Sequence, residues 1–190
     1  MQPADEILVK QSKKGDLDAF EQLVKRYENK VYNLVYRFLG NHVDAYDISQ
    51  ETFIKLYRAL PRFRGESSLM TWLSRITVNV CRDELRRRKR RNLVFMDDKN
   101  SGVKNDTGYR DYVHTGVSSP EEILERKEFC SKVKLCLYTL SEKHRLILVM
   151  REIQGMSYEE IAEILQCSQG TVKSRLNRAR QLFKEKFKWE

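Results

Sequence analysis

The last part of the chain combines positive charge with short polar side chains at a spacing that suits contacts with nucleic acid. Residues 170–188 hold seven Lys and Arg residues against Glu185, a net charge of +6. In a single helix, Val172 and Leu176 would lie on the inner face, and groups able to reach base edges and phosphates on the outer face. These outward residues are Thr171, Lys173, Ser174, Arg175, Asn177, Arg178 and Gln181. An ordinary helical hairpin with a solvated outer face would show the same pattern.

A second basic segment, residues 82–91, holds seven Lys and Arg residues against two acidic ones. The whole chain has a net charge of +9, so its excess charge is concentrated in these two segments. That distribution indicates a polyanion held at two places.

Motifs of catalysis do not occur in the sequence. The three histidines, His42, His114 and His144, lack metal-ligand spacing, and neither a glycine-rich phosphate loop nor a nucleophile elbow is present. The four cysteines are dispersed and lack the spacing of a zinc site. We therefore expect neither catalysis nor a metal or cofactor.

The elements that position these residues are expected to be helices throughout. The 190 residues include only eight Gly and three Pro, and the apolar residues recur at helical spacing. We predict an all-α fold. The expected helices cover about residues 17–39, 44–60, 69–90, 120–138, 141–155, 158–165 and 170–187.

Residues 92–119 interrupt this pattern, because they show no sustained period and exceed an ordinary connection in length. We predict a flexible linker that reaches roughly 30 Å on average and about 90 Å at full extension. It separates a first helical domain, residues 1–91, from a second, residues 120–190. Capping boxes at Ser119–Glu122 and Ser157–Glu160 mark helix starts in the second domain.

The sequence also bears on location. It contains no apolar run near the roughly 20 residues that span a bilayer, and residues 1–14 lack the apolar core of a signal peptide. Neither basic segment has a broad apolar face edged with Trp, which disfavours binding to a membrane surface. We expect a cytoplasmic protein.

Residues 159–180 have the pattern of a helix-turn-helix. A short helix has Ile161, Ala162 and Leu165 on its apolar side, a polar turn follows at residues 166–169, and the basic helix comes next. The amino-terminal residues of the second helix of such a motif normally enter the major groove of DNA. The second domain is therefore predicted to read duplex DNA.

Motifs along most of the chain resemble those of bacterial extracytoplasmic-function (ECF) sigma factors. The likeness to region 4 rests on Leu140-Ser141 and residues 158–165, 170–176 and 178–180. The likeness to region 2.2 rests on Asp44-Ala45, Asp47-Ile48, Gln50-Glu51 and Phe53. The likeness to regions 2.3 and 2.4 rests on Phe63-Arg64-Gly65, Trp72-Leu73, Ile76, Val78-Asn79 and Arg86. The chain is most similar to the group containing the enterobacterial envelope-stress sigma factor, although Tyr46 stands where many members place an acidic residue.

This resemblance implies a protein that binds RNA polymerase core and directs promoter-specific initiation. It would read the −35 element as duplex and melt the −10 element. Its implied partners are the polymerase, promoter DNA and an anti-sigma factor, commonly a membrane-bound one. The alternative is a helix-turn-helix regulator that is not a polymerase subunit.

For polymerase binding, the resemblance implicates a polar face of the second predicted helix, formed by Asp44, Asp47, Gln50 and Glu51. By analogy this face meets the clamp of the largest catalytic subunit, and a further contact is expected with the flap of the second-largest. Opposite charge across such a contact steers association and sets its register. Taken alone, the same residues could be a solvated acidic face.

For the −35 element, the expected contacts come from the basic helix. Base edges are assigned to Lys173, Ser174, Asn177 and Arg178, and phosphates to Arg175, Arg180 and Lys184, with Thr171 also in the −35 set.

For the −10 element, the loop at residues 63–68 is expected by resemblance to receive a flipped-out base, a process that requires a shaped polar pocket. The implied residues are Phe63, Arg64, Gly65, Ser67, Ser68, Trp72, Arg75 and Asn79. Gly65 would let the backbone approach the base, and Arg86 to Arg91 would contact phosphates. Trp72 could stack on a base, but Ile76 four residues later favours core packing.

Overall fold

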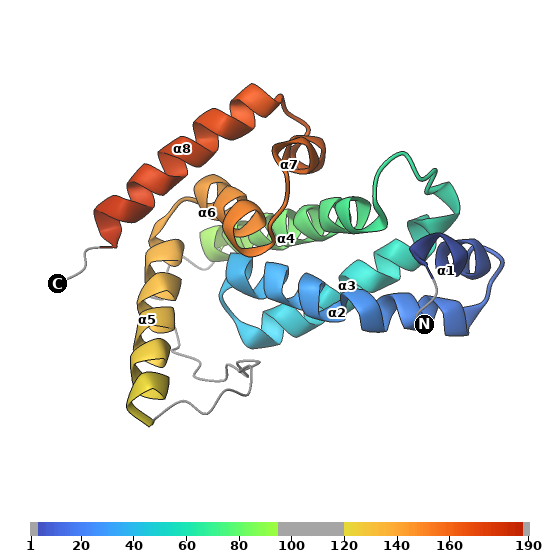
Figure 1. Cartoon of the computed structure of the whole chain (residues 1–190), viewed down its shortest axis with the longest axis horizontal. Coiled ribbons are helices and arrows are strands. Elements are labelled where there is room, and N and C mark those ends of the chain that lie inside the picture. Colours follow the sequence, from blue (N-terminus) through green and yellow to red (C-terminus); the bar gives the residue numbers. More distant parts are fainter. Residues whose placement is uncertain (1–3, 95–119, 188–190) are drawn as a thin grey trace.

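The computed structural model describes residues 4–94 and 120–187, and within these two ranges it contains helices and no strand (Figure 1). The elements are α1 (Asp5–Ser12), α2 (Leu17–Leu39), α3 (His42–Ala59), η1 (Leu60–Arg62), α4 (Leu69–Val94), α5 (Pro120–Thr139), α6 (Glu142–Leu148), η2 (Val149–Ile153), α7 (Tyr158–Leu165) and α8 (Gln169–Lys186). The all-α prediction is confirmed. Most of the predicted linker, and Ser119 of the first capping box, lie outside the described residues.

Local capping residues set the helix ends in the first domain. Asp16 accepts a hydrogen bond from the backbone nitrogen of Ala19 at 3.0 Å, and α2 ends at Gly40 with φ +88°. The predicted start of α3 at Asp44 was two residues late, because Asn41 caps the helix by accepting from the backbone nitrogen of Val43 at 2.9 Å.

Helix α1 was not among the predicted helices. Its sequence is mostly polar, but Leu8 and Val9 are buried, and Asp5 accepts hydrogen bonds from Arg26 and Tyr27 of α2. One pair of apolar residues is too short a pattern to predict a helix from periodicity. The contact with α2 therefore stabilises a helix that the local sequence does not stabilise by itself.

The second domain contains the predicted helix-turn-helix and its capping box. The Ser157 hydroxyl accepts from the backbone nitrogen of Glu160 at 3.1 Å, and the Glu160 carboxylate accepts from the backbone nitrogen of Ser157 at 2.8 Å. The helix predicted over residues 141–155 divides into α6 and one π-helical turn, η2. There the backbone nitrogen of Gln154 bonds to the carbonyl of Val149 at 3.0 Å.

One guanidinium joins the two domains. Arg145 of α6 donates to the carbonyl of Phe38 at 2.8 Å, at the carboxyl end of α2. It also donates to three carbonyls at the carboxyl end of α5, those of Leu137, Tyr138 and Leu140, at 3.1–3.2 Å. Burial lowers the pKa of Arg145, but an arginine side chain stays charged at neutral pH. A cation at this point stabilises the negative ends of both helix dipoles.

Tyr138 of α5 makes a second contact between the domains. Its hydroxyl donates to the carbonyl of Tyr36 at 3.1 Å, and burial raises its pKa, so the hydroxyl remains a donor. A Cβ atom on Gly40 would lie only 2.7 Å from the Tyr138 ring. Gly40 is therefore required both by its positive φ and by the ring packed against it.

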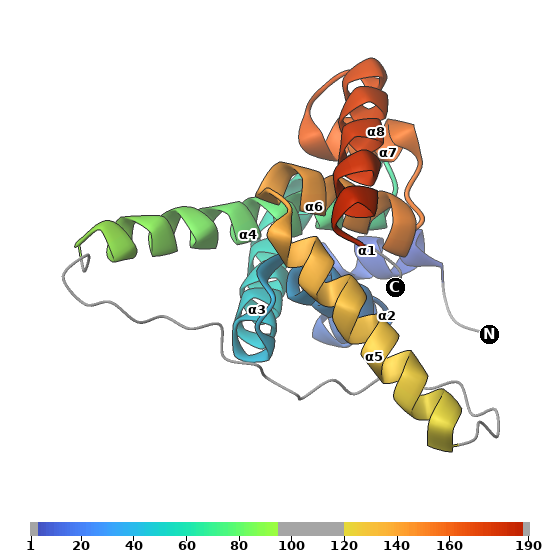
Figure 2. The ribbon, with the colours of Figure 1, turned by 90° about the vertical axis from the view of Figure 1, so that its left-hand side faces the viewer.

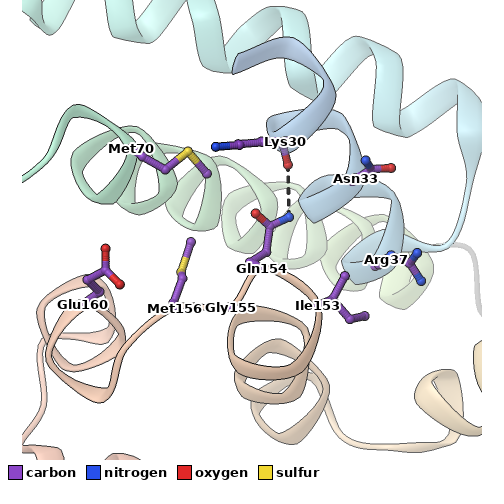
Figure 3. Close-up of a pocket in the computed structure, with 9 residues that line it drawn as sticks. All are labelled: Lys30, Asn33, Arg37, Met70, Ile153, Gln154, Gly155, Met156 and Glu160. Carbon is purple, nitrogen blue, oxygen red and sulfur yellow. Dashed lines mark hydrogen bonds between the residues drawn. The ribbon is translucent and has the colours of Figure 1, made fainter. Parts of the chain in front are cut away.

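Apolar and polar contacts both join the domains, because their buried apolar residues form one continuous core, and a cavity of about 350 Å³ lies beside the polar contacts (Figure 3). Gln154 donates to the carbonyl of Lys30 at 3.2 Å, and Thr71 donates to the Glu160 carboxylate at 3.2 Å. The cavity shows that packing between the domains is incomplete.

Parts of two helices project from this body. The carboxyl half of α4 and the amino half of α5 extend away from the packed helices (Figure 2), and residues 121–132 of α5 are all exposed. None of the helices in residues 4–94 and 120–187 combines the length and the hydropathy needed to cross a bilayer.

We predict that Gly40→Ala destabilises the protein more than Gly15→Ala. Both glycines have a positive φ, +88° and +93°, but a Cβ on Gly15 would meet no atom within 4 Å. Each substitution carries the cost of a left-handed alanine, about 1–2 kcal/mol. Gly40→Ala also displaces Tyr138, and loses its hydrogen bond, for about 1 kcal/mol more. Urea unfolding measures the difference, which should shrink in a Tyr138→Ala background; equal costs for the two glycines would contradict the prediction.

Candidate nucleic-acid interface

The outer face of α8 carries a row of exposed polar side chains above a buried inner face. Val172, Leu176 and Ala179 are buried, as are Ile161 and Ala162 of α7, against which α8 packs. The exposed residues of α8 include Lys173, Ser174, Arg175, Asn177, Arg178, Gln181 and Lys184. A helix divided in this way can enter a major groove with its polar side chains toward the bases.

Three residues of the predicted −35 set make hydrogen bonds within the protein, and one of these is Ser174, whose hydroxyl donates to the carbonyl of Thr171 at 3.1 Å. Thr171 donates its backbone N–H to the Ser168 hydroxyl at 3.2 Å, and its own hydroxyl lies 2.9 Å from the same atom. Arg180 donates two hydrogen bonds to one oxygen of Glu152 in η2, at 2.9 and 2.7 Å, which raises the pKa of Arg180. Arg180 thus holds α8 against η2, whereas Arg178 is exposed on the outer face of α8.

The predicted polymerase face of α3 is partly occupied by contacts within the first domain. Asp47 and Gln50 are exposed. Asp44 and Glu51 are half-buried; Asp44 pairs with Arg88 of α4 at 2.6 Å, and Glu51 pairs at 2.8 Å with a lysine one turn later in α3. Asp47 and Gln50 are therefore the members of this face most open to a partner.

Exposed apolar side chains lie on the same helix, and they were not among the residues predicted to contact a partner. Val43, Tyr46, Ile54 and Tyr57 are 66%, 61%, 52% and 39% exposed. Together with Gln50 they are spaced three or four residues apart, so they form one stripe along α3. Apolar residues exposed beside polar ones are typical of a protein–protein interface. One residue in the sequence could have indicated this stripe. Tyr46 stands at a position where many members of the resembled family have an acidic residue.

Much of the arginine run in α4 is paired with carboxylates. Buried Glu84 accepts from Arg88 at 2.8 Å and Arg91 at 3.3 Å, and it also pairs with Arg87. Desolvation opposes the charged form of Glu84, but these guanidinium groups outweigh it and lower its pKa. Further pairs join Arg86 to Asp83, and Lys89 to Glu142 at 2.9 Å. Phosphate contacts from this run would have to compete with these ion pairs.

The loop predicted to receive a base is held at both ends. The Ser68 hydroxyl accepts from the backbone nitrogen of Thr71 at 3.0 Å and so begins α4. The rings of Phe63 and Trp72 are 4.9 Å apart and both residues are half-buried, so Trp72 packs against the loop and the core. Gly65 has φ +75°, and a Cβ there would meet no atom within 4 Å. A glycine is therefore favoured at position 65 by the positive φ of the backbone and not by close contact with neighbouring atoms.

The other predicted −10 residues surround this loop. Arg64 and Asn79 are exposed, whereas Ser67 and Arg75 are half-buried. A cavity of about 440 Å³ opens beside the loop, which contributes residues 63–65 and 67–69 to its lining. This volume lies within the range of sites for small molecules, so the loop adjoins a space that can hold a base.

The polar and charged side chains of the described residues can bind a partner through hydrogen bonds and ion pairs. Within 4–94 and 120–187, no group of three or more His, Cys, Asp or Glu side chains is placed to hold a metal. The four cysteines are free, and burial raises the pKa of the Cys81 thiol to about 12, which makes it a poor nucleophile.

Comparison with known proteins identifies the family. The Sigma-70 region 2 model matches residues 23–91, and the Sigma-70, region 4 model matches residues 131–183. The ECF RNA polymerase sigma-E factor of Escherichia coli K12 is 40% identical over 185 residues, which cover 97% of this chain and 95% of that protein. The chain belongs to the ECF sigma-factor family. As an ECF sigma factor it directs RNA polymerase to promoters and is a non-catalytic subunit, which confirms the function predicted from the sequence.

Two solved structures have a similar fold. CnrH, in complex with the cytosolic domain of CnrY, matches with a TM-score of 0.65 and 26% identity, over 96% of each chain. The sigma factor RpoE of Bartonella quintana, in complex with the anti-sigma factor NepR, matches with a TM-score of 0.69 and 24% identity, over 88% of this chain and 95% of that one. Both likenesses extend across the two helical domains, and the prediction of two such domains is confirmed.

We predict that Glu84→Gln lowers the free energy of unfolding by about 1–3 kcal/mol at neutral pH, because a charged hydrogen-bond acceptor is lost. The pKa of Glu84 is lower in the folded protein than in the unfolded chain, where it is about 4.3. Its stabilisation is therefore complete above the unfolded value and is lost as the pH falls through the folded one. Thermal unfolding of both proteins across this range should show the difference closing in acid.

The matched control is Glu21→Gln. Glu21 pairs with Lys25 at 2.5 Å on the surface of α2, where both side chains are more than half exposed. Surface pairs of this kind contribute little, so this variant should behave like the wild type at every pH. A Glu84→Gln effect no larger than that of Glu21→Gln would show that the buried arginine cluster does not stabilise α4.

Proposed function

We propose that the exposed row of α8 reads the −35 element while the loop at residues 63–68 receives an unpaired base of the −10 element. The observation that carries this proposal is the division of α8, in which Val172 and Leu176 are buried and Lys173, Asn177 and Arg178 are exposed. Base contacts are assigned to Lys173, Ser174, Asn177 and Arg178, and phosphate contacts to Arg175 and Lys184.

The proposed polymerase contact is the outer face of α3. Asp47 and Gln50 supply polar groups that set register, and the stripe formed by Val43, Tyr46, Ile54 and Tyr57 supplies apolar area for burial. We assign this face to the clamp of the largest polymerase subunit, and the second domain to the flap of the second-largest. The proposed domain limits are residues 1–91 and 120–190, with residues 92–119 as the linker.

The docked arrangement of the two domains must open for this function. The elements are named for positions about 25 base pairs apart, which correspond to about 85 Å of duplex at about 3.4 Å per base pair. In the docked arrangement, however, Thr71 of α4 bonds directly to Glu160 of α7. Two surfaces this close cannot reach both elements at once, so we assign the docked arrangement to the protein before it binds a promoter.

An anti-sigma factor is a proposed partner of this docked state. The Bartonella quintana sigma factor of similar fold was solved with the anti-sigma factor NepR, and CnrH was solved with the cytosolic domain of CnrY. A partner that contacts both domains would stabilise the docked state by the difference in its affinity for the two arrangements. By family resemblance we propose a membrane-bound partner of this type.

Runoff transcription with purified polymerase core on a genomic library tests the proposal as a whole. The purified chain should program core to start at a limited set of sites that share two elements of fixed spacing. Initiation no different from that of core alone would contradict it.

We predict that Arg178→Ala reduces transcription from these promoters by about 10-fold or more, because one good base contact contributes about 1–3 kcal/mol of discrimination. Binding to polymerase core, measured by pull-down, should not change. Arg126→Ala is a matched control, because Arg126 is an exposed arginine on α5, outside the proposed interface. A parallel loss of core binding in Arg178→Ala would show that α8 has been assigned the wrong partner.

The double variant Asp47→Ala, Gln50→Ala tests the polymerase contact of α3. It should weaken pull-down of core and leave the basic face of α8 intact. Unchanged pull-down would refute the assignment of α3 to polymerase.

A further inference from the structure

Helix α1 is fixed in place but lies outside the residues that the Sigma-70 region 2 model matches. The Sigma-70 region 2 match begins at residue 23, whereas α1 covers Asp5–Ser12. Leu8 and Val9 are 1% and 7% exposed, and Asp5 is held by Arg26 and Tyr27. Because α1 is held in this position, its exposed face has a defined orientation relative to the rest of the first domain.

The cavity beside the −10 loop has α1 as its second wall. Asp5, Glu6, Val9 and Lys10 line it from α1, and Lys13 lines it from the position directly after the helix. The buried side of Val9 is apolar, and the lysines are exposed. A nucleotide has matching features, because its base is flat and largely apolar on its faces and its phosphates are anionic.

Lys13 ties the two walls together. Its ammonium group donates to the carbonyl of Phe63 and lies 5.9 Å from the centre of the Phe63 ring. The loop and the end of α1 are thereby joined, and the cavity keeps its shape. Lys13 is therefore a positioning residue for the loop.

Lys10 lies one turn before Lys13 in the same cavity wall and is exposed. Arg64 lines the opposite wall; its pair with Glu66, at 3.8 Å between exposed side chains, is weak and leaves it available. Among the carboxylates of α1, Asp5 is neutralised by Arg26. The lining of this space of about 440 Å³ thus holds three cations against Glu6 and the neutralised Asp5, a balance that favours an anion.

We infer that α1 forms half of a binding site for one unstacked nucleotide of the melted strand, with Lys10 contacting its phosphate and Lys13 holding the loop against it. This inference rests on the proposed role of the loop at residues 63–68, and it adds α1 to that site. The second wall lets the protein enclose the base instead of receiving it on one side only.

Crosslinking on the polymerase holoenzyme tests the inference. p-Benzoylphenylalanine is placed at Lys10, at Arg64, or at Lys14, which is exposed and outside the cavity lining. The probe is a duplex with an unpaired, randomised bubble in the non-template strand. Positions 10 and 64 should crosslink to the same unpaired nucleotide or its neighbour, and position 14 should not.

The outcomes separate the two proposals. Crosslinking from position 64 without position 10 would overturn the role of α1 and leave the loop assignment standing. Crosslinking from neither position would overturn the loop assignment, and the inference with it.

Affinity for the same probe gives a second measurement. Lys10→Ala should weaken binding about five- to tenfold, and the salt dependence should lose about 0.7 in slope, as expected for one phosphate contact to a single strand. Lys14→Ala removes the same charge four residues later and should change affinity less than about twofold. Equal effects of the two substitutions would show that only the general charge of α1 matters, which would also overturn the inference.

Discussion

The arrangement of this protein depends on one half-buried guanidinium that bonds to two helix ends from different domains. Arg145 contacts carbonyls of both α2 and α5, and no neutral side chain could satisfy as many acceptors at once. The interaction has two consequences. It fixes the orientation of the domains beside a shared apolar core, and water or other partners can satisfy the same carbonyls when the domains separate.

Positive charge serves two purposes in this sigma factor. Arg88, Arg145 and Arg180 are committed to carboxylates or carbonyls and hold helices in position. Lys173 and Arg178, in contrast, are exposed on the face of α8 that we assign to DNA. The net charge indicated a polyanion as partner, but only the packing shows which cations are available to it.

The sequence was sufficient to predict the long helices, the capping box at Ser157–Glu160 and the helix-turn-helix, because each has a local signature in periodicity or capping. Helix α1 and the π-helical turn η2 could not be predicted, since both depend on contacts with distant segments. The same distinction holds for the site. The exposed row on α8 follows from helical spacing, but the engagement of Asp44 by Arg88 and of Arg180 by Glu152 joins residues 44 and 28 positions apart.

We propose that the domains are docked in the free protein and separate on a promoter. Spin labels at Glu21 of α2 and Glu185 of α8, both exposed, allow the distance between the domains to be measured by double electron–electron resonance, after the accessible cysteines are replaced. The account predicts one short distance in the free chain and an increase of several tens of ångströms in the holoenzyme bound to a promoter. An unchanged distance in the promoter complex would contradict it.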